Sequence, residues 1–271
     1  MSGRPRPGPA AHSVMRQVTS ERALKRAARQ CMGRTGAPGP DGMTWRAFRQ
    51  DMPARLAALS ARLTDGSWQP SPARIAEFHA WGKDYRITIP TVADRVVHRS
   101  LRNAVEPVLE RDAYPPWMFG WHRRAGRPLA IAAAARHLNS GLPWVADIDV
   151  AAASRGVTLD DAVTFVARFV HDGTLLALLR RILAALPDPL AAGSGLNPML
   201  TNLRMTPVDQ QLTGLAVVRM TDNYTLFCPT HAAAADAYQH LVDTLAAHGM
   251  SPAPGKSKIW RPNPEDLYAA G

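Results

Sequence analysis

The sequence contains little cysteine, a minority of acidic residues and no long apolar run. Its 271 residues include two cysteines, Cys31 and Cys228, which are too far apart in sequence to suggest a disulfide framework or a zinc site. No stretch reaches the roughly 18 uninterrupted apolar residues of a membrane span. Residues 1–11 lack the apolar segment of a signal peptide. These absences predict a cytoplasmic protein that neither spans a membrane nor depends on disulfides.

Basic residues outnumber acidic ones. Lysine and arginine total 32 against 22 aspartates and glutamates, which gives a formal net charge of +10. Such a balance favours polyanionic partners, nucleic acid first among them. The signatures of small-molecule enzymes are missing: the sequence has no nucleophile elbow, no His-Glu-x-x-His motif and no phosphate-cradling glycine loop. Gly193-x-Gly195 lacks the third glycine of a dinucleotide fingerprint.

The sequence predicts a series of helices with a few short strands. Residues 1–13 are rich in Pro, Gly and Arg and are predicted to be a disordered basic arm. Apolar periodicity and capping residues predict helices over 20–30, 45–63, 91–110, 128–138, 158–170, 174–186, 199–212 and 231–248. Strands are expected over 87–89, 144–150, 215–220 and 224–228. Without regular βαβ alternation, this mixture predicts an α+β fold, a small antiparallel sheet with helices packed on one face.

One predicted helix carries a basic face. Arg95, His98, Arg99 and Arg102 recur opposite the apolar positions of the helix over 91–110. Such a face suits the backbone of a nucleic acid. The alternative is the ordinary solvated surface of an arginine-rich protein.

Three aspartates fall on predicted strands or turns. Asp147 and Asp149 lie two positions apart, so strand alternation places them on one face. Asp222 lies in the turn of a predicted hairpin. If the hairpin pairs beside the first strand, these carboxylates can converge on Mg²⁺, which prefers oxygen ligands. The alternative is ordinary turn chemistry and solvated carboxylates, and spacing alone leaves both open.

Seven segments together resemble the fingers and palm of the reverse transcriptases of group II introns and retrons, which are RNA-directed DNA polymerases. They occur in the family's order and cover most of residues 20–260. The segments are GAPGPDGMTWRAF (36–48), KDYRITIPTVADRVVHRSL (83–101), MFGWHRRAGRP (118–128), WVADIDV (144–150), GSGLNPMLTNLRMTPVD (193–209), RMTDNYTLF (219–227) and GMSPAPGKSKI (249–259).

The resemblance implies a fold and a set of site residues. It assigns a fingers-like region with the start of the palm to 14–140 and a palm-like region to 141–271, with no thumb. Asp147, Asp222 and Asn223 match the Mg²⁺-binding positions, and Lys256 matches the lysine beside the leaving pyrophosphate. Lys83 and Arg86 match the residues that hold the triphosphate of an incoming dNTP.

Four departures from the family's pattern lie in the implied active site. The aromatic pair after the first aspartate is Ala151-Ala152, so the side chain that rejects a ribose 2′-hydroxyl is absent at Ala152. The glutamine of the Pro-Gln-Gly loop is Ala192, the hairpin tyrosine is Met220, and the second hairpin aspartate is the neutral Asn223. We therefore expect polymerase activity to be impaired or lost. The alternative is an active, Mg²⁺-dependent reverse transcriptase with weak sugar discrimination.

The basic residues match the family better than the catalytic ones. The resemblance implies that RNA or an RNA–DNA hybrid is bound, and that a protein partner supplies the missing thumb if synthesis is processive. The expected nucleic-acid-binding residues are Arg95, Arg99, Arg102, Arg123, Arg124 and Arg127.

Overall fold

A computed structural model describes residues 14–33, 36–80, 82–123 and 125–263, without the side chain of Lys83. The chain divides into two compact units. Unit 1 comprises Met1–Ala113 and Ser154–Leu200, and unit 2 comprises Tyr114–Ala153 and Thr201–Gly271. The predicted arm over 1–13 lies outside the described residues. The boundary between fingers and palm near residue 140 stays a prediction. The two compact units meet at other points of the chain, after Ala113, Ala153 and Leu200.

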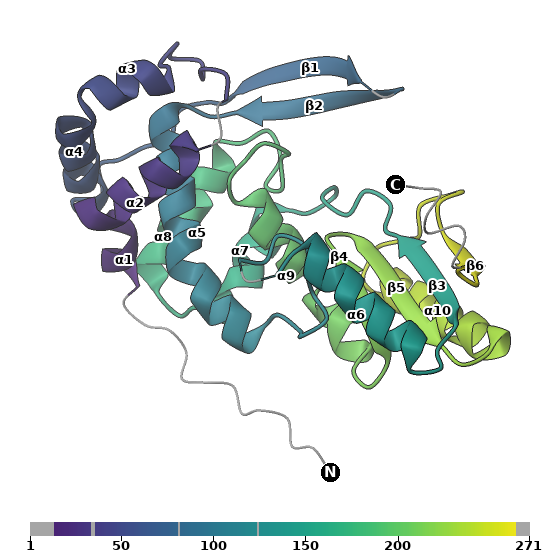
Figure 1. The fold of residues 1–271 in the computed structure, drawn as a ribbon. Helices are drawn as coiled ribbons and strands as arrows, with labels where there is room; N and C mark the ends of the chain where they lie inside the picture. Colours follow the sequence, from purple (N-terminus) through teal and green to yellow (C-terminus); the bar gives the residue numbers. More distant parts are fainter. Residues whose placement is uncertain (1–13, 34–35, 81, 124, 264–271) are drawn as a thin grey trace. The chain divides into compact units, whose positions relative to one another are not determined.

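Unit 1 is mainly helical and centres on the long helix α5 (Figure 1). The hydroxyl of Thr91 caps α5 by accepting a hydrogen bond from the Asp94 amide. Helices α1 and α2 pack against α5 and bury Val18, Leu24 and Leu101. The helices of this unit are α1 (Met15–Thr19), α2 (Glu21–Met32), α3 (Trp45–Gln50), α4 (Met52–Thr64), α5 (Val92–Asp112), α7 (Leu159–Ala167) and α8 (Gly173–Ala184).

A two-stranded antiparallel hairpin completes unit 1. Strands β1 (Arg74–Ala80) and β2 (Lys83–Ile89) pair so that Phe78 lies opposite Tyr85. The loop before α9 (Asn197–Gln211) contacts β2, because the Thr88 amide donates to the Ala192 carbonyl at 2.8 Å. A Cβ on Gly193, which has a φ of +95°, would overlap the Thr88 carbonyl oxygen, so this approach requires glycine.

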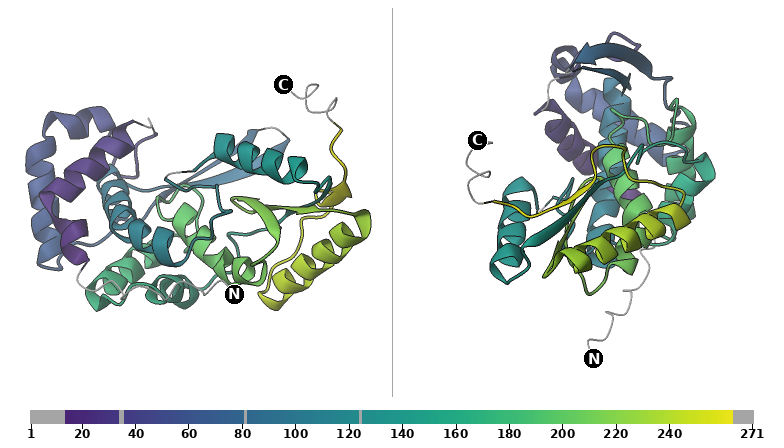
Figure 2. Two further views of the ribbon diagram at one scale, coloured as in Figure 1. Left: turned by 60° about the horizontal axis from the view of Figure 1, so that its bottom comes forward. Right: turned by 90° about the vertical axis from the view of Figure 1, so that its right-hand side faces the viewer.

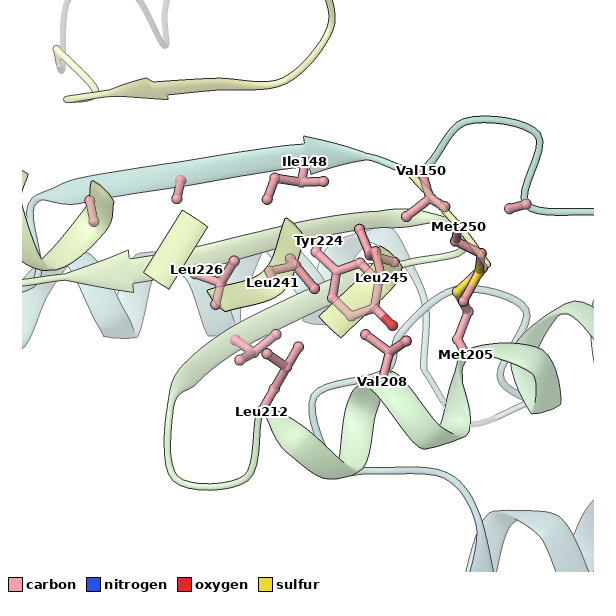
Figure 3. Packing of buried hydrophobic residues seen from close by; sticks show 14 of the residues in the cluster. Ile148, Val150, Met205, Val208, Leu212, Tyr224, Leu226, Leu241, Leu245 and Met250 are labelled. Atoms are coloured by element: carbon pink, nitrogen blue, oxygen red, sulfur yellow. The ribbon is translucent and has the colours of Figure 1, made fainter. Parts of the chain in front are cut away.

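Unit 2 is built on a four-stranded antiparallel sheet in the order β4-β5-β3-β6. The strands are β3 (Trp144–Asp149), β4 (Ala216–Met220), β5 (Asn223–Cys228) and β6 (Lys258–Trp260). One face packs against α10 (His231–Ala247) and the part of α9 that belongs to this unit. Figure 3 shows Ile148, Tyr224 and Leu226 meeting Leu241 of α10 and Val208 of α9 in this core.

The opposite face of the sheet is also covered by a helix. Helix α6 (Arg127–Asn139) packs Ala130 and Ala133 against Val145, Val218 and Phe227. In both views of Figure 2 the sheet lies between α6 and α10. The structure therefore confirms a mixed α+β architecture with small antiparallel sheets and corrects the expectation that helices pack on one face. The alanine-rich sequence of α6 permits the close approach.

Most predicted elements are present. Ser20 caps α2, and Thr158 with Asp161 forms a capping box at the start of α7. The predicted hairpin turn before Asn223 is confirmed. The predicted helix over 45–63 is two helices that meet at Asp51. Strands β1 and β6 and the short helix α1 were not predicted. Within the described residues, no helix combines the length and the apolar character needed to cross a bilayer.

Candidate functional site

The candidate site lies on the sheet of unit 2, where β3 runs antiparallel to β5. Asp147 is opposite Thr225, and Asp149 is opposite Asn223. The Val150 amide donates to the Asp222 carbonyl at 2.9 Å, so the pairing extends to the hairpin turn. The prediction that the strand over 144–150 lies beside the acidic hairpin is therefore confirmed.

A threonine hydroxyl links the two strands at this site. The Thr225 hydroxyl donates to Oδ1 of Asp147 at 2.8 Å and lies 3.4 Å from Oδ1 of Asn223. Because a hydroxyl has one proton, the shorter contact to the carboxylate is the stronger hydrogen bond. Asp147, Thr225 and Asn223 thus form a cluster on one face of the sheet, which we call the Asp147 cluster. Asp222 lies beside it on the turn, where its carboxylate accepts from the Thr221 hydroxyl at 2.7 Å.

Lys256 approaches the neighbouring aspartate of β3. Its Nζ is 3.4 Å from both carboxylate oxygens of Asp149. The backbone holds this segment in place, because the Ala253 amide donates to the Asp149 carbonyl at 2.6 Å. The structure therefore brings Lys256 to the strand that carries Asp147. With Lys256 about half exposed, the ion pair contributes little to stability.

The hairpin turn that carries Asp222 is anchored by a buried polar network. The guanidinium of Arg219 donates to both carboxylate oxygens of Asp209 at 2.9 and 2.7 Å, and to the Thr221 carbonyl at 2.8 Å. It also donates to Oδ1 of Asn202 at 3.0 Å. The Tyr224 hydroxyl donates to Asp209 at 3.0 Å. Burial raises the pKa of Asp209, while the Arg219 guanidinium opposes that rise.

The oxygen atoms at this site are of the type that Mg²⁺ prefers, but one of the three side chains carries no negative charge. Asp147 and Asp222 supply carboxylate oxygens and Asn223 supplies an amide oxygen, which are the hard ligands that Mg²⁺ prefers. However, nowhere in the described ranges do three or more His, Cys, Asp or Glu side chains gather closely enough to hold a metal ion. The neutral Asn223 lies beside Thr225, at a position where a carboxylate would add a negative charge.

The expected nucleotide-binding residues are divided between the two units. Arg86, on β2 of unit 1, is exposed and lies 3.6 Å from Glu77. The backbone of Lys83 lies in β2, but its side chain is outside the description. Ala192 is tied to β2 through Thr88, whereas Ala152 belongs to unit 2, is exposed and has a φ of +49°.

The basic face predicted for α5 is only partly correct. Arg95 and Arg99 are half-buried, and Arg102 donates twice to the buried Glu106. His98 is 1% exposed, and burial, with a smaller contribution from Arg95, lowers its pKa to about 4. His98 is therefore a neutral core residue and not part of a basic surface. The prediction that His98 lies on the basic face is wrong because the loop preceding α9 packs over that side of the helix, with Gly195 against His98.

The other expected nucleic-acid-binding residues are in unit 2. Arg123 and Arg127 are exposed, and Arg127 begins α6. Arg124 lies outside the described residues. Sequence reasoning missed Thr225 and the Arg219–Asp209 pair. A signal for the pair was present, since strand alternation places Arg219 on the same face as the core residue Val217.

The comparison with curated proteins finds a distant relative. No family model matches the chain. Among curated proteins, the chain is similar to Protein YkfC of Escherichia coli (strain K12), with 26% identity over 216 residues. The match covers 73% of this chain and 56% of YkfC, so the chain spans little more than half the length of this relative. Similarity at this level does not assign the chain to a family.

Proposed function

We propose that this protein is a reverse-transcriptase-like protein that binds RNA or an RNA–DNA hybrid and whose polymerase activity is impaired or lost. The observation that carries the proposal is the Asp147 cluster, with Asp222 on the adjoining turn. A carboxylate on a central strand beside an acidic hairpin is the arrangement that the resemblance to polymerases requires. The net charge of +10 supports a polyanionic ligand.

Impaired polymerisation follows from the chemistry of the cluster. Mg²⁺, if bound, would be held by Asp147, Asp222 and Asn223, and it would stabilise the charge that develops on the transferred phosphoryl group. An amide offers a dipole where a carboxylate offers a full charge, which weakens that binding. Alanine at positions 152 and 192 removes two further contacts to a nucleotide. If each loss costs about 2 kcal/mol, three exceed a thousandfold in rate, although losses within one site are not additive.

The alternative is an active reverse transcriptase that uses dNTPs and discriminates weakly between sugars. It is favoured by the survival of Asp147 and Asp222 and by the position of Lys256 at Asp149. The small, exposed side chain of Ala152 cannot exclude a 2′-hydroxyl by steric clash.

A paired binding and primer-extension experiment tests the proposal. RNA and hybrid binding should be tight at low salt and should weaken steeply as salt rises. Extension with Mg²⁺ or Mn²⁺ should be weak or absent and, where present, should be lost in Asp147→Ala and Asp222→Ala but not in Asp236→Ala. Asp236 is an exposed aspartate on α10 and serves as the matched control. Failure to bind either nucleic acid at low salt would refute the proposed function, and strong aspartate-dependent extension would establish the alternative.

A further inference from the structure

The outer face of helix α2 in unit 1 is strongly basic. Its cationic side chains are all exposed and follow one another at helical spacing: Arg22, Lys25, Arg26 and Arg29. Because residues three and four apart are neighbours on a helix surface, they form one patch, about 10 Å long along the axis. We call it the α2 patch. The acidic residue of this helix, Glu21, lies at its first position.

The opposite face of α2 fixes the direction in which the patch points. Leu24, Ala27 and Ala28 are fully buried where α2 packs against α5 and α4 (Figure 1). A helix that lies on a membrane inserts its apolar face into the lipid, but the apolar face of α2 is already used in the core of unit 1. The α2 patch is therefore a rigid, outward-facing charged surface that suits a soluble polyanion.

The charges of the patch have no partners in the protein. Within the described part of the chain, none of the four side chains forms a hydrogen bond or an ion pair. Even Glu21 and Lys25, which have the spacing of an ion pair, do not form one. Each cation instead has a like-charged neighbour three or four positions away, and such neighbours destabilise a helix. A bound polyanion would remove this repulsion.

The arginines of α5 in the same unit are less available. Nε of Arg95 donates to the Pro90 carbonyl at 2.9 Å, and Arg102 donates twice to the buried Glu106. A phosphate that binds these guanidinium groups has to share or replace contacts within the protein. The α2 patch offers its charges to a ligand without that cost.

We propose that the α2 patch is a surface that binds the backbone phosphates of RNA. The choice of RNA as the polyanion rests on the proposed function, whereas the availability of the four charges rests on the structure of unit 1 alone. Contacts to phosphate position a nucleic acid but carry no sequence information, so the patch binds RNA of any sequence. Each contact releases a counterion, so each cation adds to the salt dependence of binding.

The double variant Arg26→Gln/Arg29→Gln tests the inference. Its affinity for an RNA of about 20 nucleotides is compared with that of the native protein between about 50 and 200 mM salt. At about 100 mM salt it should bind at least tenfold more weakly, and the slope of log affinity against log salt should fall by about 1.4, or about 0.7 per lost contact. Arg26→Lys/Arg29→Lys keeps both charges and should stay within about threefold of the native protein. Two RNAs of unrelated sequence should respond alike.

The matched control is Arg49→Gln/Arg62→Gln, which removes two exposed charges from α3 and α4 of the same unit. It should weaken binding by less than about threefold. Glutamine is a good helix former, and the substitutions in α2 relieve like-charge repulsion, so Arg26→Gln/Arg29→Gln should unfold at or above the native melting temperature. A loss of affinity then reports on binding and not on misfolding.

The outcomes separate this inference from the proposed function. RNA binding by the native protein that is retained in Arg26→Gln/Arg29→Gln, or lost equally in Arg49→Gln/Arg62→Gln, would overturn the inference and leave the proposed function intact. Absence of RNA binding by the native protein would refute the proposed function itself. Binding to phosphatidylserine vesicles that requires the α2 patch, without RNA binding through it, would assign the patch to a membrane surface and would also overturn the inference.

Discussion

Arg219 and Asp209 form a bidentate ion pair in the interior of unit 2, where neither side chain is more than 2% exposed. Breaking such a pair from one side leaves a buried charge without compensation. Arg219→Met should therefore destabilise the protein by about 3–5 kcal/mol. The free energy of unfolding, measured by urea titration, checks this expectation.

The double variant Arg219→Met/Asp209→Leu provides the control. It removes both charges and fills their volume with apolar atoms, so it should be more stable than Arg219→Met alone. A double variant that is less stable than the single one would show that Asp209 acts mainly through its other hydrogen bond, which it accepts from the Tyr224 hydroxyl, and not through charge pairing.

The sequence predicted the parts of this molecule that depend on local signals. Ser20, Thr91 and Thr158 mark helix starts, and strand alternation correctly placed Asp147 and Asp149 on one face of β3. Its errors involve contacts between distant segments. Nothing near His98 in sequence indicates that the loop before α9 buries it, and nothing near Thr225 indicates that it pairs with Asp147. The sequence also failed to predict that helix α6 packs on the second face of the sheet, because an alanine-rich helix gives a weak amphipathic signal.

The neutral, buried His98 should make stability depend on pH. Burial lowers its pKa to about 4 in the folded protein, against about 6.5 when unfolded. Between these values the unfolded chain binds more protons, so stability is full above pH 6.5 and falls as pH drops toward 4. The loss amounts to about 3 kcal/mol. Unfolding free energies measured from pH 7.5 to 4.5 test this slope.

His98→Gln isolates the contribution of this histidine. The variant lacks the titrating group, so its stability should vary less with pH over the same range. Asp94 and Asp209, whose pKa values burial raises, contribute a slope of opposite sign, but they are present in both proteins and cancel in the comparison. Parallel pH profiles for the two proteins would show that folding does not lower the pKa of His98.

Gly120 sets the position of the hairpin turn. A Cβ at this residue would overlap the backbone nitrogen of Thr221 and lie 2.8 Å from its Cα. Thr221 has a φ of +59°, so the turn has little freedom to shift. Gly120→Ala should cost about 1–3 kcal/mol and displace Asp222. Gly141→Ala is the control. Gly141 has a φ of +82°, and no neighbour lies within 4 Å of the added Cβ, so this variant measures the cost of backbone strain without steric overlap.

A carboxylate introduced at the Asp147 cluster tests the proposal that polymerase activity is impaired. Asn223→Asp places a carboxylate beside Thr225 without a change in side-chain size, so metal affinity should rise. Mn²⁺ binding, followed by electron paramagnetic resonance, should tighten at least tenfold, and primer extension should increase. Asn223→Asp/Asp147→Ala should lose both gains, because the new carboxylate then lacks its partner across the strands. A variant that binds Mn²⁺ more tightly yet extends no primer would assign the defect to Ala152 and Ala192, which leave the nucleotide poorly held even when metal is bound.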